Sequence, residues 1–207
     1  MLEPMRKIGC IHTFEDERFR SWMVRASVAV LVAGAVAAVV WLVLSMVAGV
    51  PVPALELAGV FGGGPGAHPV AWCVAMALGV VLPLFVHELV HALAFKALAP
   101  SASHVSFGAD WGLGMLYACA EGVVYTRRSY LVIALAPTVV VTLLVALAGA
   151  MLAWPLWAIV TVTVHLAGCT GDWGYALAIH RDRSIAYCED TTWGVQFYAA
   201  GEGEGAR

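Results

Sequence analysis

The stretch FVHELVHAL, residues 85 to 93, places two histidines and a glutamate inside one of the most apolar segments of the chain. Transfer of a carboxylate or an imidazole into hydrocarbon is strongly unfavourable unless a partner or a metal ion compensates. A segment that keeps three such side chains is therefore expected to carry a site. The sequence around it indicates which kind.

The composition is that of a polytopic membrane protein. The chain has 207 residues, of which 61% are hydrophobic and 12% are charged, outside the range of an ordinary soluble domain. We predict an all-α membrane protein, one integral membrane domain with four transmembrane helices, because four apolar runs approach or exceed the roughly 20 residues that a spanning helix needs. These runs cover residues 26–50, 70–98, 130–153 and 156–180.

The first apolar run is predicted to be an uncleaved anchor. It follows a charged leader, residues 1–25, and it is longer than the roughly 7 to 15 apolar residues of a signal peptide. All eleven basic residues fall on one side of the predicted membrane, in the leader, the loop 99–129, the tail 181–207 and the helix end at Lys96. The positive-inside rule then predicts a cell-membrane protein with both termini cytoplasmic.

The expected partners are the lipid bilayer and a membrane protein or peptide. Nucleic acid is not an expected partner, because the net charge is −3 and the chain has no basic cluster with interleaved aromatic residues. The five cysteines are scattered without a Cys-x-x-Cys pair, so the sequence predicts neither a disulfide framework nor a cysteine zinc cluster. We interpret them as small hydrophobic residues.

A β-hairpin or small cytoplasmic sheet is predicted between the second and third helices. Residues 104–107 and 115–119 alternate in polarity, and glycines stand at 108, 112, 114 and 122, which is typical of short strands and turns. The exposed edge of such a sheet can hold an extended peptide by strand addition.

His87, Glu88 and His91 form the pattern His-Glu-x-x-His on the second predicted helix. On an α-helix the two histidines lie about 40° and about 6 Å apart, so both imidazoles can reach one Zn²⁺ ion. Glu88 then projects beside them, where it can act as the general base on the attacking water.

A catalytic zinc ion usually takes three protein ligands. Two candidates for the third lie within the fourth predicted helix, His165 and Asp172. Asp172 matches the depth of His87, since the two are 16 and 17 residues from the outer ends of their helices, whereas His165 lies about 10 Å nearer the outside. We favour Asp172 over a set that uses His165, because an intramembrane carboxylate needs a partner more strongly than a neutral imidazole does.

Other interpretations of these residues remain open. The group can be a structural metal site or a buried polar network joining two helices, although neither needs Glu88 beside the ligands. A non-proteolytic zinc-binding membrane adaptor is the main functional alternative to an enzyme. Metal transport is a weaker alternative, because a single intramembrane aspartate in the last helix does not provide the series of ionisable residues that an ion relay needs.

Three segments of the chain resemble a known family. HELVHAL in an apolar helix, YTRRSYLVIALAP at the start of the next and CTGDWGYALAI in the last are similar to the membrane family described as putative zincin peptidases, which is related in layout to site-2 proteases. The resemblance runs from about Val80 to Tyr198 and includes EDTTWGVQFY.

This resemblance implies a three-helix zinc metalloprotease core. In it His87, His91 and Asp172 are the zinc ligands and Glu88 is the base. One departure is visible: site-2 proteases carry Asp followed by Gly, whereas here Gly171 precedes Asp172 and Trp173 follows it.

Overall fold

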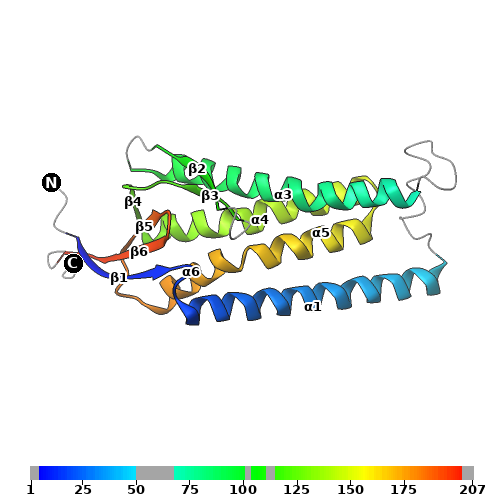
Figure 1. Ribbon diagram of the computed structural model, residues 1–207, viewed down its shortest axis with the longest axis horizontal. Coiled ribbons are helices and arrows are strands. Elements are labelled where there is room, and N and C mark those ends of the chain that lie inside the picture. Colours follow the sequence, from blue (N-terminus) through cyan, green and yellow to red (C-terminus); the bar gives the residue numbers. More distant parts are fainter. Residues whose placement is uncertain (1–4, 50–67, 101–103, 111–114, 202–207) are drawn as a thin grey trace. The chain divides into compact units, whose positions relative to one another are not determined.

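The protein is mostly helical in the part of the chain that is described. A computed structural model of the chain describes residues 5–49, 68–100, 104–110 and 115–201. The helices and strands follow one another along the chain as Figure 1 labels them. The helices are α1 (Glu17–Ala48), α3 (His68–Leu98), α4 (Arg127–Met151), α5 (Pro155–Gly168) and α6 (Thr170–Arg181).

Three of the described helices are long and apolar enough to cross a membrane, namely α1, α3 and α4. The predicted fourth span, residues 156–180, is not one continuous helix. It consists of α5, with 14 residues, and α6, with 12, and the chain passes from one to the other at Cys169. Each alone is shorter than the roughly 20 residues that a membrane crossing needs.

The sheet predicted between the second and third apolar segments is present as an antiparallel hairpin. Strand β2 (Ser106–Asp110) pairs with β3 (Met115–Cys119), and Phe107 stands opposite Ala118 in the register. The alternating polarity of these residues is therefore that of a strand pair, as the sequence indicated.

A second, four-stranded sheet corrects the prediction of an all-α fold with only this small hairpin. Its order is β1-β6-β5-β4, and its strands come from the leader, the loop before α4 and the tail. All of its pairings are antiparallel. The bounds are β1 Arg6–His12, β4 Val124–Thr126, β5 Tyr187–Thr191 and β6 Gly194–Ala199. Such short strands gain their stability from partners that are distant in sequence, which local periodicity does not reveal.

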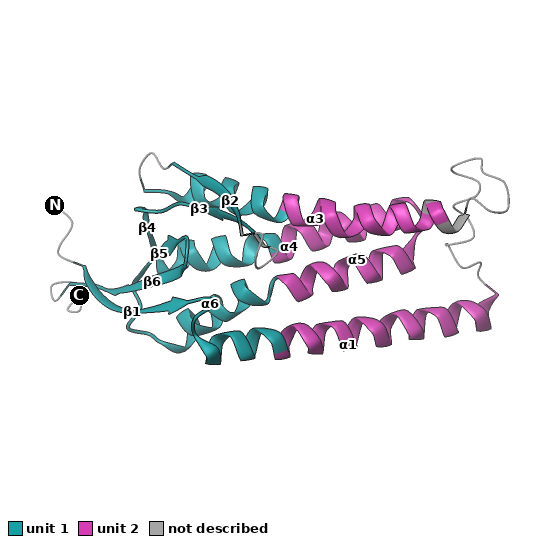
Figure 2. Cartoon of the chain, viewed as in Figure 1, with its two compact units in different colours: residues 1–24, 87–137, 169–207 teal, residues 25–86, 138–168 magenta. Residues whose placement is uncertain are grey.

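The described chain divides into two compact units, shown in different colours in Figure 2. Unit 1 comprises residues 1–24, 87–137 and 169–207 and holds both sheets, α6 and parts of α1, α3 and α4. A buried apolar cluster forms its core, to which α3 contributes Phe95, α4 contributes Tyr130 and Ile133, and β6 contributes Val195 and Phe197.

Unit 2 comprises residues 25–86 and 138–168, and small residues bring its helices close together. A Cβ atom at Gly34 of α1 would lie 2.1 Å from the side chain of Thr163 on α5. A Cβ atom at Gly79 of α3 would lie 2.6 Å from Oγ1 of Thr161. Glycine at such positions allows close helix packing where lipid supplies no hydrophobic driving force between helices.

Candidate metal centre

The candidate centre lies in unit 1, and its first two side chains come from one face of α3. His87 and His91 are four residues apart on a continuous helix, so their rings come together, with centroids 4.8 Å apart. Both residues and Glu88 between them are 9% exposed. The helix thus presents a buried, preassembled pair of imidazoles with a carboxylate beside it.

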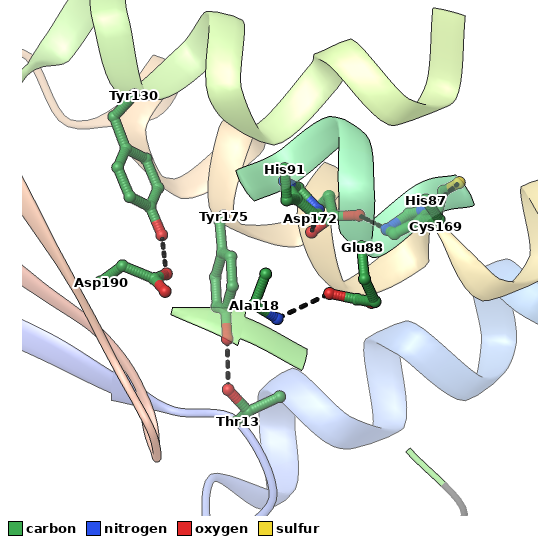
Figure 3. A network of polar contacts seen from close by, with 10 residues as sticks. All are labelled: Thr13, His87, Glu88, His91, Ala118, Tyr130, Cys169, Asp172, Tyr175 and Asp190. Atoms are coloured by element: carbon green, nitrogen blue, oxygen red, sulfur yellow. Dashed lines mark hydrogen bonds and ion pairs between the residues drawn. The ribbon is translucent and has the colours of Figure 1, made fainter. Parts of the chain in front are cut away.

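Asp172 brings a second carboxylate to this pair from the first turn of α6. Its Oδ2 atom lies 3.3 Å from Nε2 of His87, and its Oδ1 atom lies 3.5 Å from Nε2 of His91. Figure 3 shows the three side chains converging from the two helices. The structure therefore brings together all three residues that the sequence analysis named as candidate ligands.

The spacing of these atoms fits a zinc ion. Ligand atoms at about 2.0 to 2.1 Å from one Zn²⁺ in a tetrahedron are about 3.4 Å apart. The two measured separations, 3.3 and 3.5 Å, involve the two different carboxylate oxygens of Asp172 and are close to that value, and one ligand atom from each residue lies within 4.8 Å of the others. A set of two imidazoles and one carboxylate is also typical of catalytic zinc sites.

The outer nitrogens of the two histidines differ in their surroundings. Nδ1 of His87 lies 3.8 Å from the thiol sulfur of Cys169, which is buried at the junction of α5 and α6. Nδ1 of His91 is buried, and no described residue forms a hydrogen bond with it. A metal-binding histidine usually engages its second nitrogen, which fixes the ring orientation, and Cys169 can do so for His87.

Glu88 is held by the backbone of the hairpin. The amide of Ala118 in β3 donates a hydrogen bond of 2.7 Å to Oε2 of Glu88 (Figure 3). This amide points away from β2, so the hydrogen bond uses the free edge of β3 rather than the ladder. A backbone donor on a sheet restricts the carboxylate to one orientation, as a general base requires.

A third buried acid, Asp190 of β5, belongs to the same unit. The Tyr130 hydroxyl donates a hydrogen bond of 2.7 Å to its Oδ1 atom (Figure 3). Burial raises the pKa of the Asp190 carboxyl to about 7, although the hydrogen bond from Tyr130 opposes the shift. Burial also raises the pKa of the neighbouring Cys119 thiol.

Sequence reasoning missed Ala118, Cys169 and Asp190. Ala118 acts through its backbone, which no side-chain pattern reveals. Cys169 was interpreted as a small hydrophobic residue, although its place three residues before Asp172 was a usable signal. Asp190 lies in a segment that we quoted only for its family resemblance.

His165, the alternative ligand, belongs to unit 2 and lies on α5. It is 8% exposed, and its Nδ1 atom lies 3.4 Å from Oγ1 of Thr142 on α4. A polar neighbour of this kind suits a buried imidazole between two helices.

The fold and these residues define a class: a mostly helical protein with apolar, membrane-compatible helices and a His-Glu-x-x-His helix of the zincin type. The chain belongs to the family described as putative zincin peptidase, whose sequence profile matches residues 80–187. This membership indicates a zinc-dependent metallopeptidase. Comparison with curated proteins and with solved structures gives no match.

Proposed function

We propose that the protein is an intramembrane zinc metalloprotease of the site-2-protease-like type. It hydrolyses peptide bonds of membrane-associated substrates near the cytoplasmic face. The observation that carries this proposal is the convergence of His87, His91 and Asp172 at zinc-ligand distances with Glu88 beside them. Membership of a zincin peptidase family supports it.

The residues divide the chemistry between them. His87, His91 and Asp172 hold zinc, which, when bound, acts as a Lewis acid that lowers the pKa of water and polarises a carbonyl group. Glu88 accepts a proton from the water that attacks the carbonyl carbon. As the C–N bond breaks, Glu88 delivers that proton to the leaving amine, and one carboxyl and one amino terminus result.

We infer that an extended substrate binds along the free edge of β3. A helical peptide hides its carbonyl groups in its own hydrogen bonds, so a substrate helix must unwind before it can be cut. The Ala118 amide on that edge reaches the Glu88 carboxylate, and a peptide added along the edge of β3 would therefore lie next to the base.

The proposed location rests on sequence and helix composition. The helices α1, α3 and α4 have the length and apolar character of spans. The basic residues of the leader, of the first turn of α4 and of the tail favour a cytoplasmic position for these parts under the positive-inside rule. The candidate centre belongs to the unit that contains these same segments.

The substitution Glu88→Gln tests the proposal. We expect the purified variant to keep the zinc content of the wild type, because no ligand is removed. New cytoplasmic-side termini of membrane proteins, identified by mass spectrometry of cells producing the wild type, should be absent with the variant. Glu121→Gln, at an exposed turn residue, is the matched control and should behave as wild type.

Two results would contradict the proposal. If Glu88→Gln loses zinc together with activity, Glu88 is not a base that acts beside an intact metal centre. If zinc is retained and the terminus profiles of the two cell populations are identical, the protein is a zinc-binding membrane adaptor rather than a protease.

A further inference from the structure

The segment from Thr13 to Trp22 contacts helix α6 in the turn that follows Asp172. The hydroxyl groups of Thr13 and Tyr175 are hydrogen-bonded, as Figure 3 shows. The ring of Phe19, in the first turn of α1, stacks on that of Tyr175 with centroids 5.3 Å apart and planes inclined by 14°. Tyr175 follows Asp172 by three residues, so these contacts act on the helical turn that carries the ligand.

Glycine at position 174 allows this close approach. A Cβ atom there would lie 2.6 Å from Cε2 of Phe19 and 3.0 Å from Cζ3 of Trp22. The distance to Phe19 is too short for a real Cβ atom, so a larger residue at this position would require the Phe19 ring or α6 to shift. The backbone of α6 therefore lies directly against these two rings.

The leader itself is firmly attached to the four-stranded sheet. Strand β1 pairs with β6 from Arg6 to His12, with a register shift between Lys7 and Gly9. The amide of Thr13 donates to the carbonyl oxygen of Trp193 at 3.0 Å, and the rings of His12 and Trp193 stack with centroids 4.3 Å apart. Gly194 has φ +147°, and a Cβ atom there would lie 2.1 Å from the carbonyl oxygen of Ile11. The segment that contacts α6 is therefore anchored in the four-stranded sheet.

Helix α6 needs such support, because it has only 12 residues. Isolated helices of this length are marginally stable in water and take their position from packing. At its carboxyl end the Arg127 guanidinium donates to the carbonyl oxygens of His180 and Asp182. The leader holds the turn next to Asp172, at the other end of the helix.

We propose that the leader is part of the metal centre, in which Thr13, Phe19 and Tyr175 are positioning residues that set the place of the Asp172 carboxylate. Residues 13 and 19 precede the segment 80–187 that matches the family profile, whereas Tyr175 lies within it. The inference rests on the metal site of the proposed function and not on peptide cleavage.

The test measures zinc affinity, by competition with a chromophoric chelator, for the full-length protein in detergent. We expect Thr13→Val and Tyr175→Phe each to weaken zinc binding by up to about 10-fold, the lower end of the range found when direct partners of metal ligands are removed, because these residues act on Asp172 through the helix. Thr13→Ser keeps the hydroxyl and should restore wild-type affinity. The visible spectrum of the Co²⁺-substituted protein should change in the first two variants and not in the third.

A matched control separates positioning from general destabilisation. Thr126 accepts a hydrogen bond from the amide of Ser129 at the start of α4, which carries no ligand. Thr126→Val should lower thermal stability as Thr13→Val does, yet leave zinc affinity unchanged. Gly174→Ala should also weaken zinc binding, because the added methyl group would displace α6 from the rings of Phe19 and Trp22.

The outcomes distinguish this inference from the proposed function. If the wild type binds zinc and Thr13→Val, Tyr175→Phe and Gly174→Ala all bind it equally well, the positioning role is wrong while the metal centre stands. If the wild type binds no zinc, both fail. If the variants lose affinity but the wild type cleaves nothing, the positioning role stands and the protease assignment fails.

Discussion

Oδ2 of Asp172 lies 3.3 Å from Nε2 of His87, although the two side chains come from different helices, α6 and α3. A close, buried contact between a carboxylate and an imidazole is what two ligands of one metal ion require. It is also the geometry of a simple ion pair. The two interpretations predict different behaviour when Asp172 is changed.

Replacement of Asp172 by alanine is expected to lower zinc affinity by more than about 100-fold, since loss of a direct ligand should exceed the 10- to 100-fold effect of an outer partner. Metal analysis of the purified variant checks this. Asp182→Ala, at an exposed position after α6, is the control and should retain zinc. A wild-type protein without stoichiometric zinc would instead favour the polar network.

Replacement of Ala118 by proline removes the amide that donates to Glu88. Proline is tolerated where an edge strand does not need its N–H for the ladder, so the hairpin should persist. Loss of a hydrogen bond to a charged group corresponds to about 1.5 to 3 kcal/mol, and we expect the cleavage rate to fall by about 10- to 100-fold. The variant should keep its zinc, as metal analysis can show.

Ala118→Gly keeps the amide and is the control for this change. It should cleave at a rate much closer to that of the wild type. Equal rates for the proline and glycine variants would show that the Ala118 amide does not orient the base.

Replacement of Cys169 by alanine removes the sulfur atom near Nδ1 of His87. We expect zinc affinity to fall by about 10-fold, the lower end of the range for outer partners of metal ligands, because the sulfur contact is long. Cys169→Ser should lie between alanine and the wild type.

The comparison for Cys169 is Cys188→Ala, at another buried thiol in the same unit. This variant should lose stability through a cavity in the core without a change in zinc affinity. If Cys169→Ala also binds zinc as the wild type does, the sulfur does not orient His87.

The stability of the zinc-free protein should depend on pH through Asp190. Its folded pKa is about 7 against an ordinary value of 3.8, so the folded state binds the proton more tightly than the unfolded state. This contribution to stability is fully present below about pH 4 and is lost as the pH rises toward 7, by up to about 1.4 kcal/mol per pH unit.

Thermal unfolding in the presence of a chelator, from pH 4 to 8, measures this dependence. The groups that influence the Asp190 carboxyl are Tyr130, Cys119, His91 and Asp172. Asp190→Asn should flatten the curve between pH 4 and 7. If Asp190→Asn has the same pH profile as the wild type, the pH dependence of stability arises from one of the other groups.

Residues 85 to 93 were enough to predict the first half of the candidate metal centre. The four-residue spacing of His87 and His91 and the position of Glu88 follow from helix periodicity, a local property that sequence expresses directly. Asp172 was also accessible to sequence reasoning, because few ionisable side chains occur in the apolar runs and each of them demands a partner. The length and composition of the apolar runs predicted α1, α3 and α4, because both are also local properties of the sequence.

Only the tertiary structure decided how these pieces are held. The pairing of β1 with β6 joins segments from opposite ends of the chain, and the contacts of Tyr175 with Thr13 and Phe19 depend on that pairing. The hydrogen bond from Ala118 to Glu88 involves a backbone amide, which carries no trace in the residue type. Strand register and close packing arise from long-range contacts, whereas the sequence patterns that can be interpreted without a structure are set by neighbours within one or two turns.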